Sequence, residues 1–125
     1  MRPMPIEALV DTGSPWIAIT PKDALRLNIS IKHLRKAPQY TTVMLAGIKF
    51  WRYLLKGVSV HMKDEKGGII SIALPSISVL WPTQKKLPKG TKNIPSILGS
   101  DFLTTAKLSL HFDPSKQIAF LEKQT

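Results

Sequence analysis

Short apolar runs, separated by proline, glycine and polar residues, dominate this chain. The pattern is typical of β-strands joined by turns. Strands are predicted at 6–10, 16–19, 40–45, 49–55, 58–62, 69–74, 77–81, 108–112 and 117–121. Val58 and Val60 alternate with polar residues, which predicts a strand with one buried face. Pro75 predicts a break or bulge between the two runs that flank it, because proline cannot donate to a strand ladder. The pattern therefore predicts a β-rich, all-β fold.

Two short helices interrupt the predicted strands. Thr20 followed by Pro21 predicts an N-cap and a first helical residue. Asp23 is then expected to accept a hydrogen bond from the N-cap amide, as in a capping box. The predicted helix covers 22–27, with Ala24 and Leu27 toward the core and Asn28 as terminator. A second helix is predicted at 102–106, capped by Ser100 or Asp101.

Turns are predicted where small or polar residues separate two runs. Ala46-Gly47 predicts a hairpin, the acidic stretch 63–68 predicts a turn, and the stretch 113–116 predicts a type I turn in a final hairpin. The proline-punctuated stretch 82–93 carries four lysines and is predicted to be a mobile loop.

Composition limits the class of protein. A chain of 125 residues with 43% hydrophobic and 21% charged residues indicates one globular domain, 1–125, without a linker or repeat. The chain contains no cysteine, and no apolar run reaches the ~20 residues of a membrane span. Its first residues lack the apolar core of a secretory signal. We therefore expect a cytoplasmic protein with no membrane association.

The net charge of +10 suggests an anionic partner. The basic clusters at 32–36 and 85–92 lie in predicted loops, and no aromatic residues alternate with the cations as base stacking would require. Solvated loops explain them better than a nucleic-acid surface does, so nucleic acid is an unlikely partner. His33, His61 and His111 have no metal-ligand spacing, and the sequence predicts neither a metal nor a cofactor.

Asp11 is the residue whose setting most needs an explanation. It ends one apolar run and precedes another, and a carboxylate there is costly unless it is hydrogen-bonded. Gly13 permits a sharp turn that brings an amide close to the acid, and the hydroxyls of Thr12 and Ser14 add donors. The simpler alternative is that Asp-Thr-Gly forms only a turn.

A second motif makes the pattern specific. Leu9-Val10-Asp11-Thr12-Gly13-Ser14 is followed 88 residues after Asp11 by the glycine of Ile97-Leu98-Gly99-Ser100-Asp101-Phe102-Leu103. Together, in this order, the two motifs resemble those of the retropepsin-like aspartic proteases, over roughly 6–121. The resemblance implies an all-β acid-protease β-barrel with a flap hairpin and one or two short helices.

The resemblance also implies roles for individual residues. Asp11 would be the catalytic acid, Thr12 would bond across to the opposite loop, and Gly13 would present its amide to the carboxylates. Gly99 would let the second motif pass beneath this loop, with Ile97 and Leu98 as core. The hairpin at Ala46 and Gly47 would be the flap over an extended polypeptide substrate; the alternative is an ordinary connection in a sheet.

Carboxylate-based peptide hydrolysis needs two acids, and the chain offers one Asp-Thr-Gly. The missing acid must then come from a second copy, which predicts a two-fold homodimer with two Asp11 carboxylates at the axis. Only ten residues precede Asp11, whereas the family usually has a further strand there. Either residues 2–6 replace part of that strand, or residues 118–121 carry the dimer contact alone. The expected activity is that of an aspartic endopeptidase, a hydrolase. The alternative is a non-catalytic retropepsin-like dimerisation or peptide-binding module.

Overall fold

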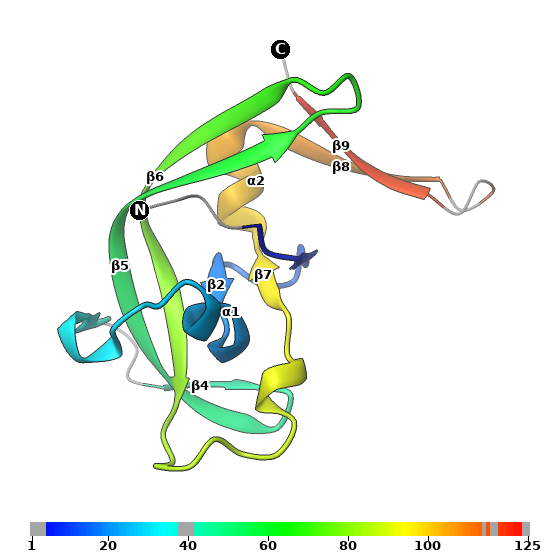
Figure 1. The fold of residues 1–125 in the computed structure, drawn as a ribbon. Helices are drawn as coiled ribbons and strands as arrows, with labels where there is room; N and C mark the ends of the chain where they lie inside the picture. Colours follow the sequence, from blue (N-terminus) through cyan, green and yellow to red (C-terminus); the bar gives the residue numbers. More distant parts are fainter. Residues whose placement is uncertain (1–4, 38–41, 114, 116–117, 124–125) are drawn as a thin grey trace.

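The fold is built mainly of β-strands, in a computed structural model that describes residues 5–37, 42–113, 115 and 118–123 (Figure 1). The described strands are β1 (Ala8–Val10), β2 (Ala18–Ile19), β3 (Arg35–Lys36), β4 (Thr42–Leu45), β5 (Ile48–Lys63), β6 (Ile69–Pro82), β7 (Ser96–Leu98), β8 (Leu108–Asp113) and β9 (Ile118–Lys123). The described helices are α1 (Pro21–Arg26), α2 (Ser100–Ala106) and the short 3₁₀ segments η1 (Ile31–His33) and η2 (Thr91–Asn93). The expected all-β class is therefore confirmed. None of the described helices is long and apolar enough to cross a membrane.

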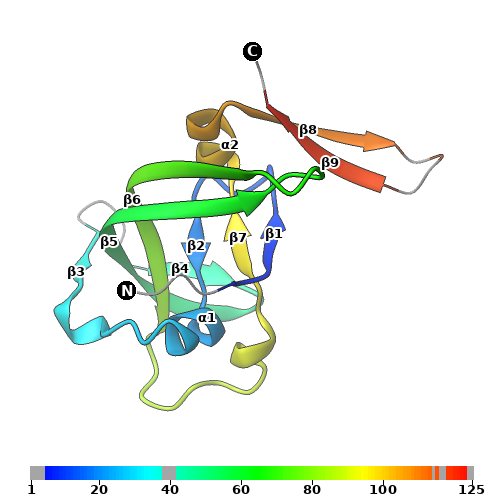
Figure 2. The same ribbon diagram turned by 45° about the horizontal axis from the view of Figure 1, so that its top comes forward.

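A seven-stranded sheet forms the body of the molecule, in the order β1-β7-β2-β6-β5-β3, with β4 also paired to β5. Strand β7 lies between β1, to which it is parallel, and β2, to which it is antiparallel (Figure 2). The two motifs singled out in the sequence thus lie side by side, with Val10 opposite Leu98. The expected β-barrel is not closed within the described residues, because β1 and β3 end the strand order without pairing to each other.

Strands β5 and β6 form one long hairpin, in place of the four shorter strands expected. The register is the same on both sides of Pro75, from Lys56↔Ser76 to Val58↔Leu74, so there is no bulge, and the expected break is reduced to the one position, Gly57 and Pro75, at which no pair forms. Gly57, which faces Pro75, has φ +69, a left-handed conformation that residues with a Cβ rarely adopt. The glycine therefore takes up the backbone distortion, and both strands continue past the proline. The predicted alternation is confirmed, since Val58 is half-buried and Ser59 is exposed.

The β4–β5 hairpin turns at Ala46 and Gly47, as predicted. Leu45 pairs with Ile48, which leaves a two-residue loop with φ +51 and +77. Two positive φ values are the mark of a type I′ turn, whose twist matches that of the flanking strands. Tyr40, the predicted first residue of the leading strand, lies outside the described residues.

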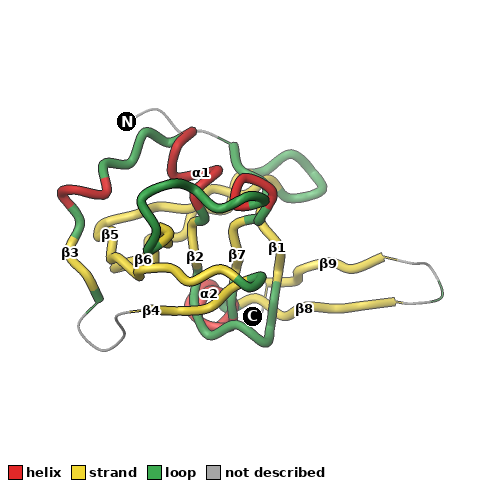
Figure 3. The backbone as a smooth tube through the Cα atoms, turned by 90° about the horizontal axis from the view of Figure 1, so that it is seen from below, coloured by secondary structure: helices red, strands yellow, loops and turns green. Residues whose placement is uncertain are grey.

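The final hairpin is also confirmed, since β8 and β9 pair from Leu108↔Lys123 to Asp113↔Ile118. Pro114 and Lys116 of the predicted turn lie outside the described residues. These two strands form a separate two-stranded sheet, and they extend away from the rest of the molecule in all three views (Figure 3).

Helix α1 begins and ends within one residue of the predicted 22–27, and the predicted roles of Pro21 and Asn28 are confirmed. Pro21 is its first residue, and Asn28 has φ +56 just beyond its end. The amides of Asn28 and Ile29 donate to the carbonyls of Leu25 and Ala24, which is the Schellman arrangement of hydrogen bonds. Ala24 is buried as expected, whereas Leu27 is only half-buried.

The predicted side-chain cap of α1 is wrong, and a buried hydroxyl from β7 takes its place. Thr20 Oγ1 donates to the Ile94 carbonyl at 2.7 Å and makes no cap bond. Asp23 does not reach back directly: Ser96 Oγ donates to Asp23 Oδ2 at 2.5 Å and accepts from the Thr20 amide at 3.1 Å. Lys22 Nζ lies 3.3 Å from the same carboxylate. This relay ties the start of α1 to the start of β7.

Replacing Ser96 by Ala should lower the free energy of unfolding by roughly 2–3 kcal/mol, because the buried Asp23 carboxylate loses its hydroxyl donor and the buried Thr20 amide loses its acceptor. Ser96 is 1% exposed, so water cannot take the place of the hydroxyl. Urea unfolding followed by tryptophan fluorescence measures the change. Ser59→Ala, at an exposed position of β5, is the matched control and should change stability by less than about 0.5 kcal/mol. Equal effects of the two substitutions would show that the relay adds nothing.

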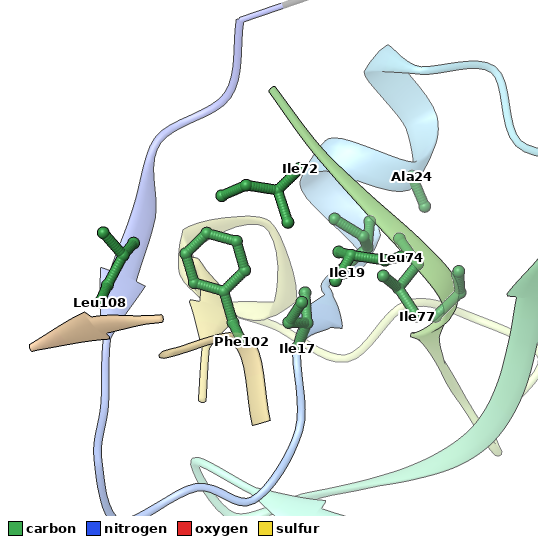
Figure 4. Packing of buried hydrophobic residues seen from close by; sticks show 9 residues of the cluster. Ile17, Ile19, Ala24, Ile72, Leu74, Ile77, Phe102 and Leu108 are labelled. Atoms are coloured by element: carbon green, nitrogen blue, oxygen red, sulfur yellow. The ribbon is translucent and has the colours of Figure 1, made fainter. Parts of the chain in front are cut away.

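Helix α2 begins at Ser100, two residues before its predicted start at Phe102. Gly99 is the N-cap, and Ser100 and Asp101 lie inside the first turn. Asp101 Oδ1 instead accepts a hydrogen bond from the Phe102 amide at 2.7 Å. Phe102 is fully buried and packs with Ile17 and Leu108 in the main core cluster (Figure 4). The core thus lies directly beneath the junction of β7 and α2.

Candidate active-site loop

The backbone between β1 and β2 wraps around the side chain of Asp11. The Gly13 amide donates to Asp11 Oδ1 at 2.9 Å, and the Ser14 amide donates to the Asp11 carbonyl at 3.1 Å. The Asp11 amide donates to the Leu98 carbonyl of β7 at 3.0 Å. The carboxylate is therefore fixed by its own loop, and it is half-buried in a surface position. The expected contact between the Gly13 amide and the carboxylate is confirmed.

Gly99 lies where this loop crosses the end of β7. A Cβ on Gly99 would lie 2.4 Å from the Trp16 carbonyl oxygen and 2.5 Å from that of Ser14. Both contacts are with backbone, which cannot rotate away as a side chain can. Gly99 has φ −87 and ψ −174, which any residue can adopt, so the requirement for glycine is steric. The expectation that Gly99 allows a close approach beneath the loop is confirmed.

The start of α2 holds the other half of the loop. The Ser100 amide donates to the Ser14 carbonyl at 2.8 Å, and the Asp101 amide donates to the Pro15 carbonyl at 3.2 Å. Ile97 is buried and Leu98 packs against the core, as expected for residues that support the loop. The Asp11 loop is thus anchored to β7 on one side and to α2 on the other.

Thr12 and Ser14 occupy different positions in this loop. Thr12 is exposed, and its hydroxyl makes no hydrogen bond to the described residues. Ser14 is half-buried, and its hydroxyl donates a hydrogen bond of 3.4 Å to the Trp16 carbonyl within the same loop. A bond from Thr12 to the opposite loop would require a second chain and stays a prediction.

Three other described aspartates have local partners. Asp23 is fully buried against Ser96, and Asp64 accepts from the amides of Lys66 and Gly68 in the β5–β6 turn. Asp101 accepts from the amide that follows it in α2. Asp11 differs from these three because its loop is hydrogen-bonded both to β7, through Leu98, and to the start of α2, through Ser100.

Ala46 and Gly47 do not belong to the Asp11 loop. Both are exposed at the β4–β5 turn, and the hairpin lies well away from α2 in Figures 1 and 2. The Asp11 loop, in contrast, is bonded to the start of α2. A flap role for this hairpin stays a prediction.

A stacked pair beside the loop was not anticipated from the sequence. The Arg52 guanidinium lies 4.3 Å from the centre of the Trp16 ring, and its Nε donates to Ser78 Oγ at 2.8 Å. Trp16 and Arg52 are 36 positions apart, so only the pairing of β5 with β6, and of β6 with β2, brings them together. Phe50, two positions before Arg52 on β5, is fully buried in the core.

The histidines do not form a metal site in the part of the chain that the structure describes. No group of three or more His, Cys, Asp or Glu side chains there lies close enough to hold an ion. His61 Nδ1 is 2.8 Å from Ser71 Oγ across β5 and β6, and His111 Nε2 is 3.6 Å from Glu122 Oε2 across β8 and β9. Both are cross-strand contacts within exposed hairpins.

Comparison of the chain with protein-family models, with curated proteins and with solved structures finds no match. The loop itself combines an amide-fixed carboxylate, a glycine that crosses beneath it, and anchoring by β7 and by the start of α2.

Proposed function

We propose that this chain is one half of an aspartic endopeptidase, whose active site is completed by the Asp11 loop of a second copy. The observation that carries the proposal is the position of Asp11 in an accessible loop, with its carboxylate oriented by the Gly13 amide and the loop seated on Gly99. A rigid, preorganised carboxylate is what acid–base chemistry on a bound water requires.

Two such carboxylates would divide the work of hydrolysis. Like charges held close together cannot both ionise at low cost, so a pair shares one proton. The ionised member takes a proton from the attacking water, and the protonated member gives its proton to the carbonyl oxygen of the scissile bond. The tetrahedral intermediate then collapses, and the amine leaves with a proton from the pair. Because the pair needs its shared proton, we expect the activity to be highest at acidic pH.

The outer surface of the fold supports a second copy as the missing partner. β1, which leads into Asp11, ends the strand order of the sheet, and Leu9 on it is 53% exposed. The β8–β9 hairpin extends from the body and exposes Leu110. An isolated two-stranded hairpin is marginally stable in water, and an unpaired strand edge is a template for pairing. A symmetric dimer would cover these features and bring two Asp11 loops together.

An extended polypeptide is the substrate that suits this arrangement. The β4–β5 hairpin is a regular two-residue turn with an exposed tip, and Met44 on it is 66% exposed. A hairpin of this kind can close over a strand-like ligand through backbone hydrogen bonds, which accept many side-chain sequences. We therefore propose unfolded or extended protein segments as the substrate class.

Mixing wild-type protein with inactive Asp11→Asn protein tests whether one site needs two chains. If dimers form at random, an equal amount of the variant should halve the activity per wild-type chain, and a threefold excess should reduce it to about one quarter. The measurement is cleavage of unfolded casein at acidic pH, with each mixture incubated long enough for subunits to exchange.

The control is the same mixture made with Gly90→Ala protein, which keeps Asp11, so the activity per chain that carries Asp11 should stay constant at every ratio. Activity per wild-type chain that stays constant at every Asp11→Asn ratio, in mixtures shown to contain heterodimers, would contradict a shared site. A stable dimer with no cleavage of any unfolded protein would favour the peptide-binding alternative.

A further inference from the structure

A groove of about 710 Å³ lies on the surface beside β3, away from the Asp11 loop. The segment that runs from the end of α1 through β3 contributes Ile29, Ile31 and two exposed lysines, Lys32 before β3 and Lys36 in it. The long hairpin contributes two half-buried aromatic side chains, Tyr53 of β5 and Trp81 of β6. This volume is within the range of ligand-binding clefts, roughly 300–1,000 Å³.

The pairing of three strands gathers aromatic rings and cations on one face. Trp51 pairs with Trp81, and Lys36 pairs with Tyr53, so their side chains lie on the same side of the sheet. Lys36 Nζ lies 3.9 Å from the centre of the Trp51 ring. The basic cluster 32–36, which has no aromatic residue among its own neighbours in sequence, therefore meets three aromatic rings in space.

The chain around this groove is free of negative charge over long stretches. Residues 24–63 contain no Asp or Glu, and neither do residues 66–100. The same stretches carry thirteen lysines and arginines, namely Arg26, Lys32, Arg35, Lys36, Lys49, Arg52, Lys56, Lys63, Lys66, Lys85, Lys86, Lys89 and Lys92. Between them lie only Asp64 and Glu65, in the β5–β6 turn. The groove thus lies in a segment that attracts anions.

We propose that this groove binds single-stranded nucleic acid, with bases against Tyr53 and Trp81 and phosphates at Lys32 and Lys36. Aromatic platforms in a cationic groove are the combination that holds single strands without sequence preference. An acidic peptide is less well served, because β3 is only two residues long and offers little edge for strand pairing. The proposal is independent of the proteolytic function, since the groove and the Asp11 loop use different residues.

Fluorescence anisotropy with a fluorescein-labelled twelve-nucleotide oligo-dT tests the proposal on the full chain. The double variant Lys32→Ala, Lys36→Ala should raise the dissociation constant at least about tenfold at low salt and should make binding less steeply dependent on salt. The matched control is Lys63→Ala, Lys66→Ala, at the other end of β5 beside Asp64 and Glu65, which should change it less than about threefold. A single Lys32→Glu variant repeats the test without removing the contact of Lys36 with Trp51.

Two competitors separate base stacking from simple charge attraction. An abasic strand with the same number of phosphates should bind roughly tenfold or more weakly, because it has no base to stack. Polyglutamate, which has charge but no bases, should compete poorly with oligo-dT. Binding of oligo-dT should quench tryptophan fluorescence, because the bases are proposed to lie against Trp81.

The proposal is overturned by any of three results. One is that oligo-dT does not bind at low salt. Another is that the abasic strand or polyglutamate binds as tightly as oligo-dT, which would point to an acidic-peptide or purely electrostatic surface. The third is that the control pair of lysines matters as much as Lys32 and Lys36.

Discussion

Asp11→Asn should abolish proteolysis and leave the fold intact. The substitution removes the group that takes a proton from water, and we expect the rate of casein cleavage at acidic pH to fall by at least about 10³-fold. Asparagine has the same shape and keeps an oxygen that can accept from the Gly13 amide, a bond of 2.9 Å in this structure. The midpoint of thermal unfolding should therefore move by no more than a few degrees.

Asp101→Asn is the matched control for this experiment. Asp101 is an exposed aspartate of the second motif, and its Oδ1 accepts from the Phe102 amide, a bond that asparagine can also make. The control should keep near wild-type activity. Full activity in Asp11→Asn, or loss of activity in Asp101→Asn with Asp11→Asn still active, would place the chemistry elsewhere in the molecule.

Gly99→Ala should be among the most destabilising single substitutions in the chain. The added methyl would lie 2.4 to 2.7 Å from three backbone atoms of Ser14 and Trp16, all in the loop that carries Asp11. Overpacking against backbone costs more than overpacking against a flexible side chain, and we expect the free energy of unfolding to fall by roughly 3 kcal/mol or more. That is a large part of the 5–15 kcal/mol typical of a domain.

Gly90→Ala separates this steric effect from the general cost of replacing glycine. Gly90 has φ +87 and open space around its Cβ position, so its substitution should cost only about 1–2 kcal/mol of backbone strain. Urea unfolding of both variants gives the comparison. If Gly99→Ala is as stable as Gly90→Ala, the crossing of the loop over β7 is not tight in solution.

The features that the sequence predicted correctly are those that short stretches determine. The turn at Ala46-Gly47, the end of α1 at Asn28 and the Asp11–Gly13 contact each depend on residues within a few positions. The pairing of the two motifs was also anticipated through a family resemblance, and the structure places Val10 beside Leu98. The local geometry of the candidate site could therefore be predicted before the fold was known.

The predictions that were wrong concern residues whose structure depends on a segment distant in sequence. Thr20 was expected to cap α1, but its hydroxyl bonds to Ile94, 74 positions away, and Ser96 supplies the link to Asp23. Pro75 was expected to interrupt a strand, but Gly57 on the neighbouring strand absorbs the distortion. These effects depend on which strands pair, and the residues near Thr20 or Pro75 in the sequence do not indicate them.

The basic cluster 32–36 illustrates the same limit for function. Its neighbours in sequence contain no aromatic residue, and on that ground nucleic acid was considered an unlikely partner. Strand pairing places Trp51, Tyr53 and Trp81 against it. The chemistry of this surface is a property of the assembled sheet, which the order of residues along the chain does not show.

The parallel pairing of β1 with β7 has a consequence for when the Asp11 loop can form. β1 precedes most of the chain and β7 follows most of it, so the contact between Val10 and Leu98 closes a very long loop. Contacts of that kind form late, because the entropy of closing the loop must be overcome first. A chain emerging from the ribosome would expose Asp11 early but could not seat its loop until residues 96–101 had been made. Under the proposed function, the Asp11 loop would therefore stay inactive until β7 has been made and has paired with β1.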